Sequence, residues 1–572
     1  MSRVGTVGEL LRPLVAWNPG PERRWIALRA ATAAAVPMVL ISLLGNHHDA
    51  FMAGLGVFAV LYGAGGPVRR RFRTIPLAGL GLLLAIGLGI LTAGHAFVGI
   101  VAMAVVATAA ALLTYTLGIG PPAAFFFALD LGIAHLAATG GAAPGKVLGF
   151  AALGVLSAIV VGTSDAWFRV TGIEEAAVST AEQLVDAYVR EEDPAAVPRA
   201  RRTAAGALSR AWTVVTDGGT QEVFEGRLQR VNNRYASTVA RAVGGTDAEV
   251  TAEMALHQAA SVRQVSLGRP RPGWSLRQAL RWPSEDLLVA ARVAAATLLA
   301  GCIALLLDNA HAYWAAGFAI LVVQMGGTRI SQHHRALHRT VGTATGLVLF
   351  AAVLALDLSH WWLVAVVIMF QGVVELLVTR NYAMAVTFIT PLALVISSRL
   401  TAMDTETIVL DRALDTLIGV GSAVLVLAVS GRLGRPELLL RAHGRRVVLA
   451  LDDVLADLAE RRTRTDAGMA AHLDHCRQLY VELIGSDVVA ARAHADAPQE
   501  VAPYREMEQL LASIGYQVLG AAWNPRVRGQ RELMSQAREA LAGLTHHPVT
   551  RHRPAEAITA DLRRVRAILA EA

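Results

Sequence analysis

Long apolar runs alternate with short polar breaks in two blocks of the chain, and a charged stretch follows each block. Each apolar block divides into six segments of helical length. They are residues 26–44, 51–68, 74–92, 97–118, 122–138 and 147–164 in the first block, then 287–307, 313–327, 340–356, 361–378, 383–398 and 413–430 in the second. A helix that crosses a bilayer needs about 17–25 apolar residues. Several segments lie at or below this limit, which indicates local bilayer thinning or partial burial in protein. The pattern predicts twelve membrane spans.

This arrangement predicts an all-α polytopic membrane protein, with two repeats of six transmembrane helices that are each followed by a cytoplasmic helical bundle. The membrane units are expected at residues 25–170 and 286–431, and the cytoplasmic domains at 171–285 and 432–572. Residues 1–24 form an N-terminal arm, which is either a short helix in the membrane interface or a disordered segment.

Arginine placement predicts the orientation, because cytoplasmic loops of membrane proteins carry an excess of Arg and Lys. One set of loops is rich in arginine, and its members are Arg69, Arg70, Arg71, Arg73, Arg329, Arg335, Arg339 and Arg380. The alternate loops are mostly acidic. The arginine-rich side, both charged blocks and both termini are therefore expected in the cytoplasm of a bacterial cell, with the spans in its inner membrane.

The two apolar blocks align with each other. Arg29 in the first block corresponds to Arg292 in the second, and Arg73-Thr74 corresponds to Arg339-Thr340. Because each half has an even number of spans, the repeats are expected to be parallel, related by an axis along the membrane normal. The chain would then be an internal pseudo-dimer, either on its own or as the subunit of a homo-oligomer.

Four stretches of the second block carry a resemblance to a known family. They are YWAAGFAILVVQ from Tyr313, RTVGTATG from Arg339, NYAMAVTFITP from Asn381 and RALDTLIG from Arg412. This pattern resembles the fusaric acid resistance-like (FUSC-like) membrane family, which is similar to bacterial aromatic acid exporters and, more distantly, to plant aluminium-activated malate channels. The resemblance implies that Arg339, Thr340, Gly342, Gly346, Tyr382, Arg412 and Asp415 are family motif residues.

The first block departs from this pattern. Ala50-Phe51 stands where the second block has Tyr313-Trp314, and Lys146 stands where it has Arg412. The two halves are therefore expected to be functionally unequal.

Composition and charge exclude several classes of protein. Charged residues make up 17% of the chain and the mean hydropathy is +0.45, whereas soluble domains carry roughly 25% charge. The two cysteines, Cys302 and Cys476, are too far apart for a CxxC metal site or a disulfide framework. The net charge of +7 is not concentrated in one basic tract, so nucleic acid is not an expected partner. No enzyme, metal or cofactor motif is complete, and none of these is expected.

Ionisable side chains inside spans are costly, by about 2.5–3.5 kcal/mol each near the bilayer centre. Arg29 and Arg292 either snorkel to lipid headgroups or line a passage that attracts anions. Asp130, His135 and Glu375 either relay protons or pair with arginines in structural ion pairs.

Two further pairs have alternative interpretations. Tyr313 and Trp314 either belong to an aromatic belt at the membrane interface or flank the exit of a substrate pathway. Thr390 and Pro391 mark either a helix break beside a cavity or a plain kink. Asp415 is expected to pair with Arg412 on its own helix, and Gly342 and Gly346 to pack against a neighbouring helix.

The predicted function is an inner-membrane transporter that exports small organic anions, with aromatic carboxylates as the class that the resemblance implies. A passive anion channel is the alternative mechanism. A membrane scaffold without transport activity, whose cytoplasmic domains bind other proteins, is the alternative from a different class. The lipid bilayer and the anion are the expected partners.

Overall fold

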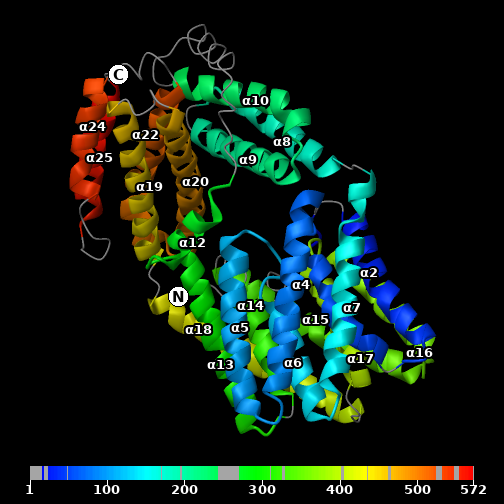
Figure 1. The fold of residues 1–572 in the computed structure, drawn as a ribbon. Coiled ribbons are helices and arrows are strands. Elements are labelled where there is room, and N and C mark those ends of the chain that lie inside the picture. Colours follow the sequence, from blue (N-terminus) through cyan, green and yellow to red (C-terminus); the bar gives the residue numbers. More distant parts are fainter. Residues whose placement is uncertain are drawn as a thin grey trace. The chain divides into compact units, whose positions relative to one another are not determined.

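The computed structural model describes most of the chain. The described residues are 14, 16–18, 23–47, 49–168, 171–193, 196–241, 269–309, 311–324, 329–400, 405–433, 436–460, 466–523, 531–545 and 553–570. Most of the predicted N-terminal arm lies outside them. Within the described residues the secondary structure consists of helices, without a β-strand (Figure 1). The predicted all-α fold is confirmed.

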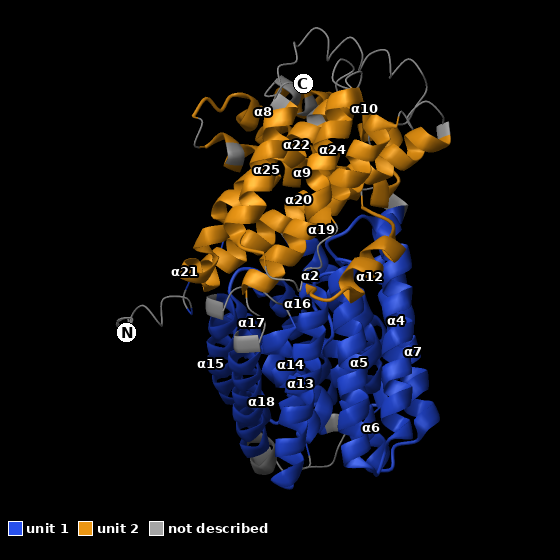
Figure 2. Cartoon of the chain, turned by 90° about the vertical axis from the view of Figure 1, so that its left-hand side faces the viewer, with its two compact units in different colours: residues 1–170, 285–433 blue, residues 171–284, 434–572 orange. Residues whose placement is uncertain are grey.

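The chain forms two compact units (Figure 2). Unit 1 contains residues 1–170 and 285–433, and unit 2 contains residues 171–284 and 434–572. We expected a separate bundle for each charged block, but their helices share one hydrophobic core. Val185 and Tyr235 from the first charged block belong to the same buried cluster as Leu451 and Tyr480 from the second. Amphipathic helices from either block can bury their apolar faces against each other, and the sequence pattern does not specify which partner they take.

Unit 1 holds the helices of both apolar blocks. In the first half they are α2 (Arg24–Leu43), η1 (Asp49–Met52), α3 (Ala53–Val57), η2 (Phe58–Leu61), α4 (Val68–Leu91), α5 (Ala96–Thr116), α6 (Phe125–Thr139), α7 (Pro144–Gly162) and η3 (Ser164–Phe168). In the second half they are α13 (Glu285–Leu306), α14 (Ala312–Val323), α15 (Arg329–Ala355), α16 (His360–Leu377), α17 (Tyr382–Leu400) and α18 (Thr405–Leu433).

Eight helices in the described part of the chain are long and apolar enough to cross a membrane. Four shorter apolar stretches lie between them, at Asp49–Leu61, Phe125–Thr139, Ala312–Val323 and Tyr382–Ser398. These are the second and fifth of the twelve predicted spans in each half. The short elements are buried, as η1, α3, η2 and α14 show. Irregular or short segments are tolerated at membrane depth where protein surrounds them. Leucines exposed on the longer helices, such as Leu77 and Leu84 of α4, suit a lipid-facing surface.

Corresponding helices pack in the same way in the two halves. Helix α4 packs against α6 in the first half, and α15 packs against α17 in the second. The first helix of each half also packs against the fourth helix of the other half, so that α2 contacts α16 and α13 contacts α5. The halves are therefore interleaved rather than simply placed beside each other.

Glycines allow several of these helices to approach closely. A Cβ atom at Gly154 of α7 would lie 2.1 Å from the backbone oxygen of Ala53. At Gly342 of α15 it would lie 2.5 Å from the backbone oxygen of Ala383, and at Gly346 it would lie 2.7 Å from the Cβ of Thr390. The predicted packing role of Gly342 and Gly346 is confirmed, and their partner is α17.

Unit 2 is a helical bundle. Its helices are α8 (Gly172–Val189), α9 (Val197–Gly218), α10 (Gln221–Arg241), α12 (Pro272–Leu280), α19 (Pro436–Ala459), α20 (Asp466–Asp496), α21 (Pro498–Val501), η5 (Ala502–Tyr504), α22 (Arg505–Trp523), α24 (Arg531–Thr545) and α25 (Ala555–Ala570). The apolar face predicted for residues 447–461 is the buried face of α19.

Candidate functional site: a buried arginine–aromatic stack

Helix α14 lies in the interior of unit 1. It packs against α13 and α18 of its own half and against α6 of the first half. Almost all of its residues are buried, so Trp314 and Phe318 project into protein rather than lipid. The two side chains are four residues apart and lie on the same face of the helix, with their ring centroids 5.6 Å apart.

Two arginines lie over these rings. The guanidinium carbon of Arg412, from α18, is 3.7 Å from the ring centroid of Trp314. That of Arg339, from α15, is 4.4 Å from the ring centroid of Phe318. Together Arg412, Trp314, Phe318 and Arg339 form what we call the arginine–aromatic stack. Guanidinium groups over aromatic faces are attracted by the ring quadrupole, which explains why the two cations are tolerated there.

The stack leaves hydrogen-bonding capacity unused. Arg339 is 1% exposed and Arg412 is 3% exposed. The Nε and Nη1 atoms of Arg339, and Nη1 of Arg412, are buried without a hydrogen-bond partner. Most buried polar groups in proteins do have such a partner. An anion with several acceptor oxygens could accept hydrogen bonds from these donors.

A carboxylate network adjoins the Arg412 end of the stack. Asp415 is fully buried, and its Oδ2 lies 3.9 Å from Nη1 of Arg412. The other oxygen of Asp415 accepts a hydrogen bond of 2.8 Å from Asn309. The predicted local pair of Arg412 and Asp415 is confirmed, although the 3.9 Å contact is too long for a hydrogen bond.

Tyr313 and Trp314 are not at a lipid-facing surface. Tyr313 is 6% exposed and Trp314 is 2% exposed. Tyr313 packs against α6, where a Cβ atom at Gly132 would lie 2.5 Å from its ring. Residues of an aromatic belt would lie against headgroups, so this burial favours the pathway interpretation of the pair.

The two first-helix arginines have partners on the final helical segment of their own half. The Nη1 atom of Arg29 lies 2.5 Å from Asp165 of η3, and the Nε atom of Arg292 donates to Ser430 of α18 at 2.9 Å. Arg71, which the sequence placed in a loop, is buried in α4 and contacts the same Asp165 at 2.5 Å. One carboxylate thus faces two guanidinium groups, so a net positive charge remains at this end of the first half.

The three candidate proton-coupling residues are not brought together. Asp130 of α6 is fully buried, and neither of its carboxylate oxygens has a hydrogen-bond partner. His135, one turn further along α6, has its Nδ1 3.1 Å from the hydroxyl of Thr92. Glu375 of α16 forms an ion pair of 2.5 Å with Arg23, which agrees with the structural alternative for this residue.

The remaining predicted residues have local roles. The hydroxyls of Thr340 and Thr390 donate to carbonyls one turn earlier, those of Ala336 and Val386. Pro391 lies inside α17 rather than at its start. The Tyr382 ring is 6.5 Å from that of His338. Of these residues, Tyr382 interacts with Arg339 of the arginine–aromatic stack.

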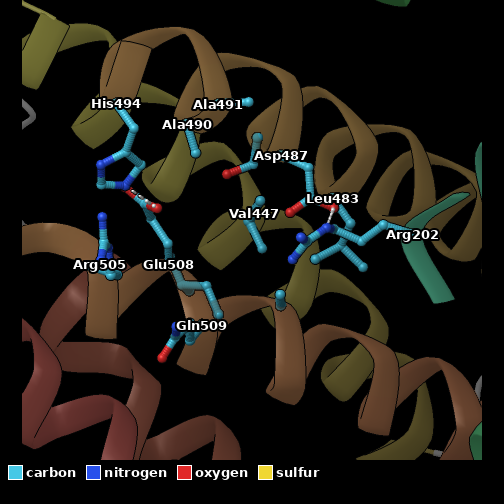
Figure 3. Close-up of a pocket in the computed structure, with 13 residues that line it drawn as sticks. Arg202, Val447, Leu483, Asp487, Ala490, Ala491, His494, Arg505, Glu508 and Gln509 are labelled. Atoms are coloured by element: carbon cyan, nitrogen blue, oxygen red, sulfur yellow. Dashed lines mark hydrogen bonds and ion pairs between the residues drawn. The ribbon is translucent and has the colours of Figure 1, made fainter. Parts of the chain in front are cut away.

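Unit 2 contains a cavity of about 410 Å³ between α9, α19, α20 and α22 (Figure 3). Two pairs of opposite groups line it. Arg202 lies 3.8 Å from Asp487, and His494 is 2.9 Å from Glu508. Burial raises the pKa of Asp487 to about 6. Arg505 is a further arginine of its lining.

Unit 2 also contains a histidine–carboxylate cluster that the sequence analysis did not predict. Asp457 of α19 contacts His475 and His472 of α20 at 2.7 and 3.3 Å, and the sulfur of Cys476 lies 3.6 Å from His472. Asp457 lies on α19 and the other three residues lie on α20, so the packing of the two helices brings them together. Within the described residues, no group of three or more His, Cys, Asp or Glu side chains has a geometry that could hold a metal ion.

Comparison with known proteins finds a family match in the part of the chain that contains the stack. Residues 299–426 match the family described as Fusaric acid resistance protein-like. The chain is also similar to the "Uncharacterized membrane protein YvaC" of Bacillus subtilis (strain 168), with 25% identity over 434 residues that cover 66% of this chain and 68% of that protein. No solved structure matches. All four residues of the stack lie within the matched range. The protein is therefore an all-α polytopic membrane protein in which residues 299–426 are similar to the Fusaric acid resistance protein-like family.

Proposed function

We propose that this protein transports small organic anions across the membrane, and that the path passes the arginine–aromatic stack. The observation that carries the proposal is the pair of buried guanidinium groups, Arg339 and Arg412, in which three nitrogen atoms have no hydrogen-bond partner among the described residues. The match to the fusaric acid resistance protein-like family supports a role in transport.

The chemistry of the stack suits an aromatic carboxylate. Arginine keeps its charge in any protein environment and binds carboxylates through a planar fork of donors. The rings of Trp314 and Phe318 are suited to offset or edge-to-face contacts with another aromatic ring. Because the stack is buried, its electrostatic attraction is stronger than the same groups would exert in water. The donors and the rings together would bind an anion and an apolar body in one place.

Asp130 favours coupled export over a passive channel. An ionised carboxylate without a partner is expensive inside a membrane protein, so this side chain is expected to bind and release a proton as its surroundings change. Gly132, two residues away on α6, contacts Tyr313 on α14. A change at Asp130 could thus reach the helix that carries the aromatic rings of the stack.

The proposal includes an internal pseudo-dimer in a bacterial inner membrane, with the charged unit in the cytoplasm. The equivalent helix pairs in the two halves, α4 with α6 and α15 with α17, support a repeat. The arginine-rich loops support the orientation.

Flux of radiolabelled benzoate in proteoliposomes tests the proposal. Arg339→Gln and Arg412→Gln should each reduce benzoate flux at least about tenfold, the change that corresponds to 1.4 kcal/mol. Arg69→Gln is the matched control, because Arg69 is an exposed arginine of the same unit, and it should transport normally. Wild-type protein that carries neither benzoate nor an aliphatic carboxylate would favour the scaffold alternative instead.

Asp130→Asn separates the two transport mechanisms. It should abolish accumulation of benzoate against a gradient and leave exchange of internal for external benzoate partly intact. If this variant still accumulates benzoate, coupling does not depend on Asp130.

A further inference from the structure

A second and larger cavity lies in unit 2. It has a volume of about 700 Å³ and is formed by α12, α19 and α20 together with the residues that follow α12. Volumes of about 300–1,000 Å³ are typical of small-molecule sites. Four arginines and two tryptophans are among its lining residues, whereas two arginines and no tryptophan are among the described residues that line the cavity in Figure 3.

The cations on the α12 side of this cavity are not compensated. Arg277 and Arg281 are exposed, and neither makes an ion pair with any residue in the described part of the chain. On the opposite wall, Arg446 of α19 donates a hydrogen bond of 3.0 Å to the backbone oxygen of Gln278, and so connects α19 to α12.

Three carboxylates, Asp452, Asp453 and Glu482, line the walls that α19 and α20 form, against four arginines in the whole cavity. Asp452 accepts a hydrogen bond of 3.1 Å from Arg538. Glu482 is 5% exposed, and burial raises its pKa to about 7 against the opposing effect of Arg446. The cavity therefore carries a positive charge on the α12 side that its own acidic residues do not balance.

Two indole rings supply an apolar and aromatic surface beside these cations. Trp274 is half-buried in α12, and Trp282 is 59% exposed. An exposed tryptophan beside unpaired arginines offers a surface on which a planar ring can stack while its charged group reaches a guanidinium.

We propose that this cavity is a binding site for small aromatic carboxylates, separate from the arginine–aromatic stack in the membrane unit. The carboxylate binds Arg277 and Arg281, and its ring packs against Trp282. Residues 281–284 lead directly from α12 into α13, the first helix of the second membrane half. Occupancy of the cavity therefore restrains the segment from which that membrane helix begins, which makes the site regulatory.

Binding can be measured independently of transport, by isothermal titration calorimetry of the full-length protein in nanodiscs of pure phosphatidylcholine. The probe is 1-naphthoate, and cyclohexanecarboxylate serves as an anion without an aromatic ring. All variants are made in an Arg339→Gln background, in which the membrane site is disabled. Thermal unfolding of each variant reports whether it is folded.

The parent Arg339→Gln protein should bind 1-naphthoate and should bind cyclohexanecarboxylate more weakly. Replacement of both Arg277 and Arg281 by Gln should weaken 1-naphthoate binding at least about tenfold, because two charged hydrogen-bonding groups are lost. Trp282→Leu should weaken it about fivefold, whereas Trp282→Phe should keep it within about twofold, because a phenyl ring can still stack. Arg505→Gln, which removes one exposed arginine from the other cavity, should leave binding unchanged.

Three results would overturn the site. Loss of all 1-naphthoate binding in the parent Arg339→Gln protein would assign binding to the membrane unit alone, and would leave the proposed transport function intact. Unchanged affinity in the folded Arg277 and Arg281 double variant would exclude the cavity. Abolition of 1-naphthoate binding by phosphatidylglycerol in the nanodisc would show that the cavity holds anionic lipid headgroups instead.

Discussion

Replacement of Arg339 by methionine separates a functional arginine from a structural one. Arg339 is 1% exposed, and two of its nitrogen atoms have no hydrogen-bond partner. Each buried donor left unpaired costs roughly 1–3 kcal/mol, and the contact with the Phe318 ring returns only about 0.5–2 kcal/mol. Methionine has a similar length and buries no donor. Arg339→Met should therefore leave the free energy of unfolding unchanged or raise it by about 1–2 kcal/mol, as with other buried charges that apolar residues replace.

The same substitution should reduce benzoate flux at least about tenfold, because the guanidinium that would hold the carboxylate is gone. Arg339→Lys keeps the charge without the planar fork, so it should retain part of the flux. The assays are denaturant unfolding in detergent and flux in proteoliposomes, on the same preparations. Arg412→Met is an instructive contrast, since it would leave Asp415 buried without its cation and should destabilise the protein. An Arg339→Met protein that is several kcal/mol less stable yet transports normally would refute this reasoning.

Three other predictions concern packing, pH and topology. Gly419→Ala should lower the unfolding temperature, because its Cβ would lie 2.4 Å from the backbone oxygen of Ala315 and overpacking typically costs about 1–3 kcal/mol. Gly421→Ala is the control and should leave the unfolding temperature unchanged, because no atom lies within 4 Å of its Cβ. Equal effects of the two substitutions would contradict this prediction. Burial alone would lower the pKa of His472. The adjacent Cys476 sulfur and the carboxylate of Asp457 have the opposite and larger effect, and together they raise the pKa from 6.5 to about 9. Protonated His472 should therefore stabilise the fold fully below pH 6.5, and this stabilisation should disappear as the pH rises through about 9. Thermal unfolding should show the loss as a fall in unfolding temperature, and His472→Gln should make that fall smaller. In a background without native cysteines, a single cysteine near residue 357 should react with an impermeant maleimide in intact cells and one near residue 72 should not, and the reverse would invert the topology.

The hydropathy pattern predicted the helices of unit 1 well, because burial in lipid demands long apolar runs. The expected span at 97–118 is α5 at Ala96–Thr116, and the expected span at 147–164 is α7 at Pro144–Gly162. The same criterion misplaced the starts of the third helices. Charged residues were assigned to loops, whereas α15 begins at Arg329 and so carries Arg339 about three turns into the helix. A buried arginine and a loop arginine have the same sequence signature, and only tertiary contacts distinguish them.

Only some residues of the candidate site were predicted, because tertiary contacts are not visible in the hydropathy pattern. Arg412 and Trp314 were singled out as motif and pathway residues, but their contact across α18 and α14 was not expected. Phe318 lies in the quoted stretch from Tyr313 but was not singled out, because one phenylalanine in an apolar run resembles its neighbours. The partner of Arg29 was also unpredictable, because Asp165 is 136 positions away in the sequence. Pairings of this kind depend on how helices pack, and an apolar pattern does not encode them.

The structure also shows how the two halves differ. The second half has Arg412 over Trp314, whereas the corresponding Lys146 of the first half is 61% exposed on its side chain and pairs with Asp49 at 3.1 Å. The buried carboxylate Asp130 lies on the fifth helix of the first half, and the fifth helix of the second half, α17, contains no acidic residue. The arginine–aromatic stack and the carboxylate of Asp130, which has no hydrogen-bond partner, thus lie in different halves. Under the proposed function, the anion would pass through the second half, while Asp130 of the first half would bind and release the proton. Because α6 packs directly on α14, the two tasks would be linked by one helix contact, and a transport cycle would then need both halves.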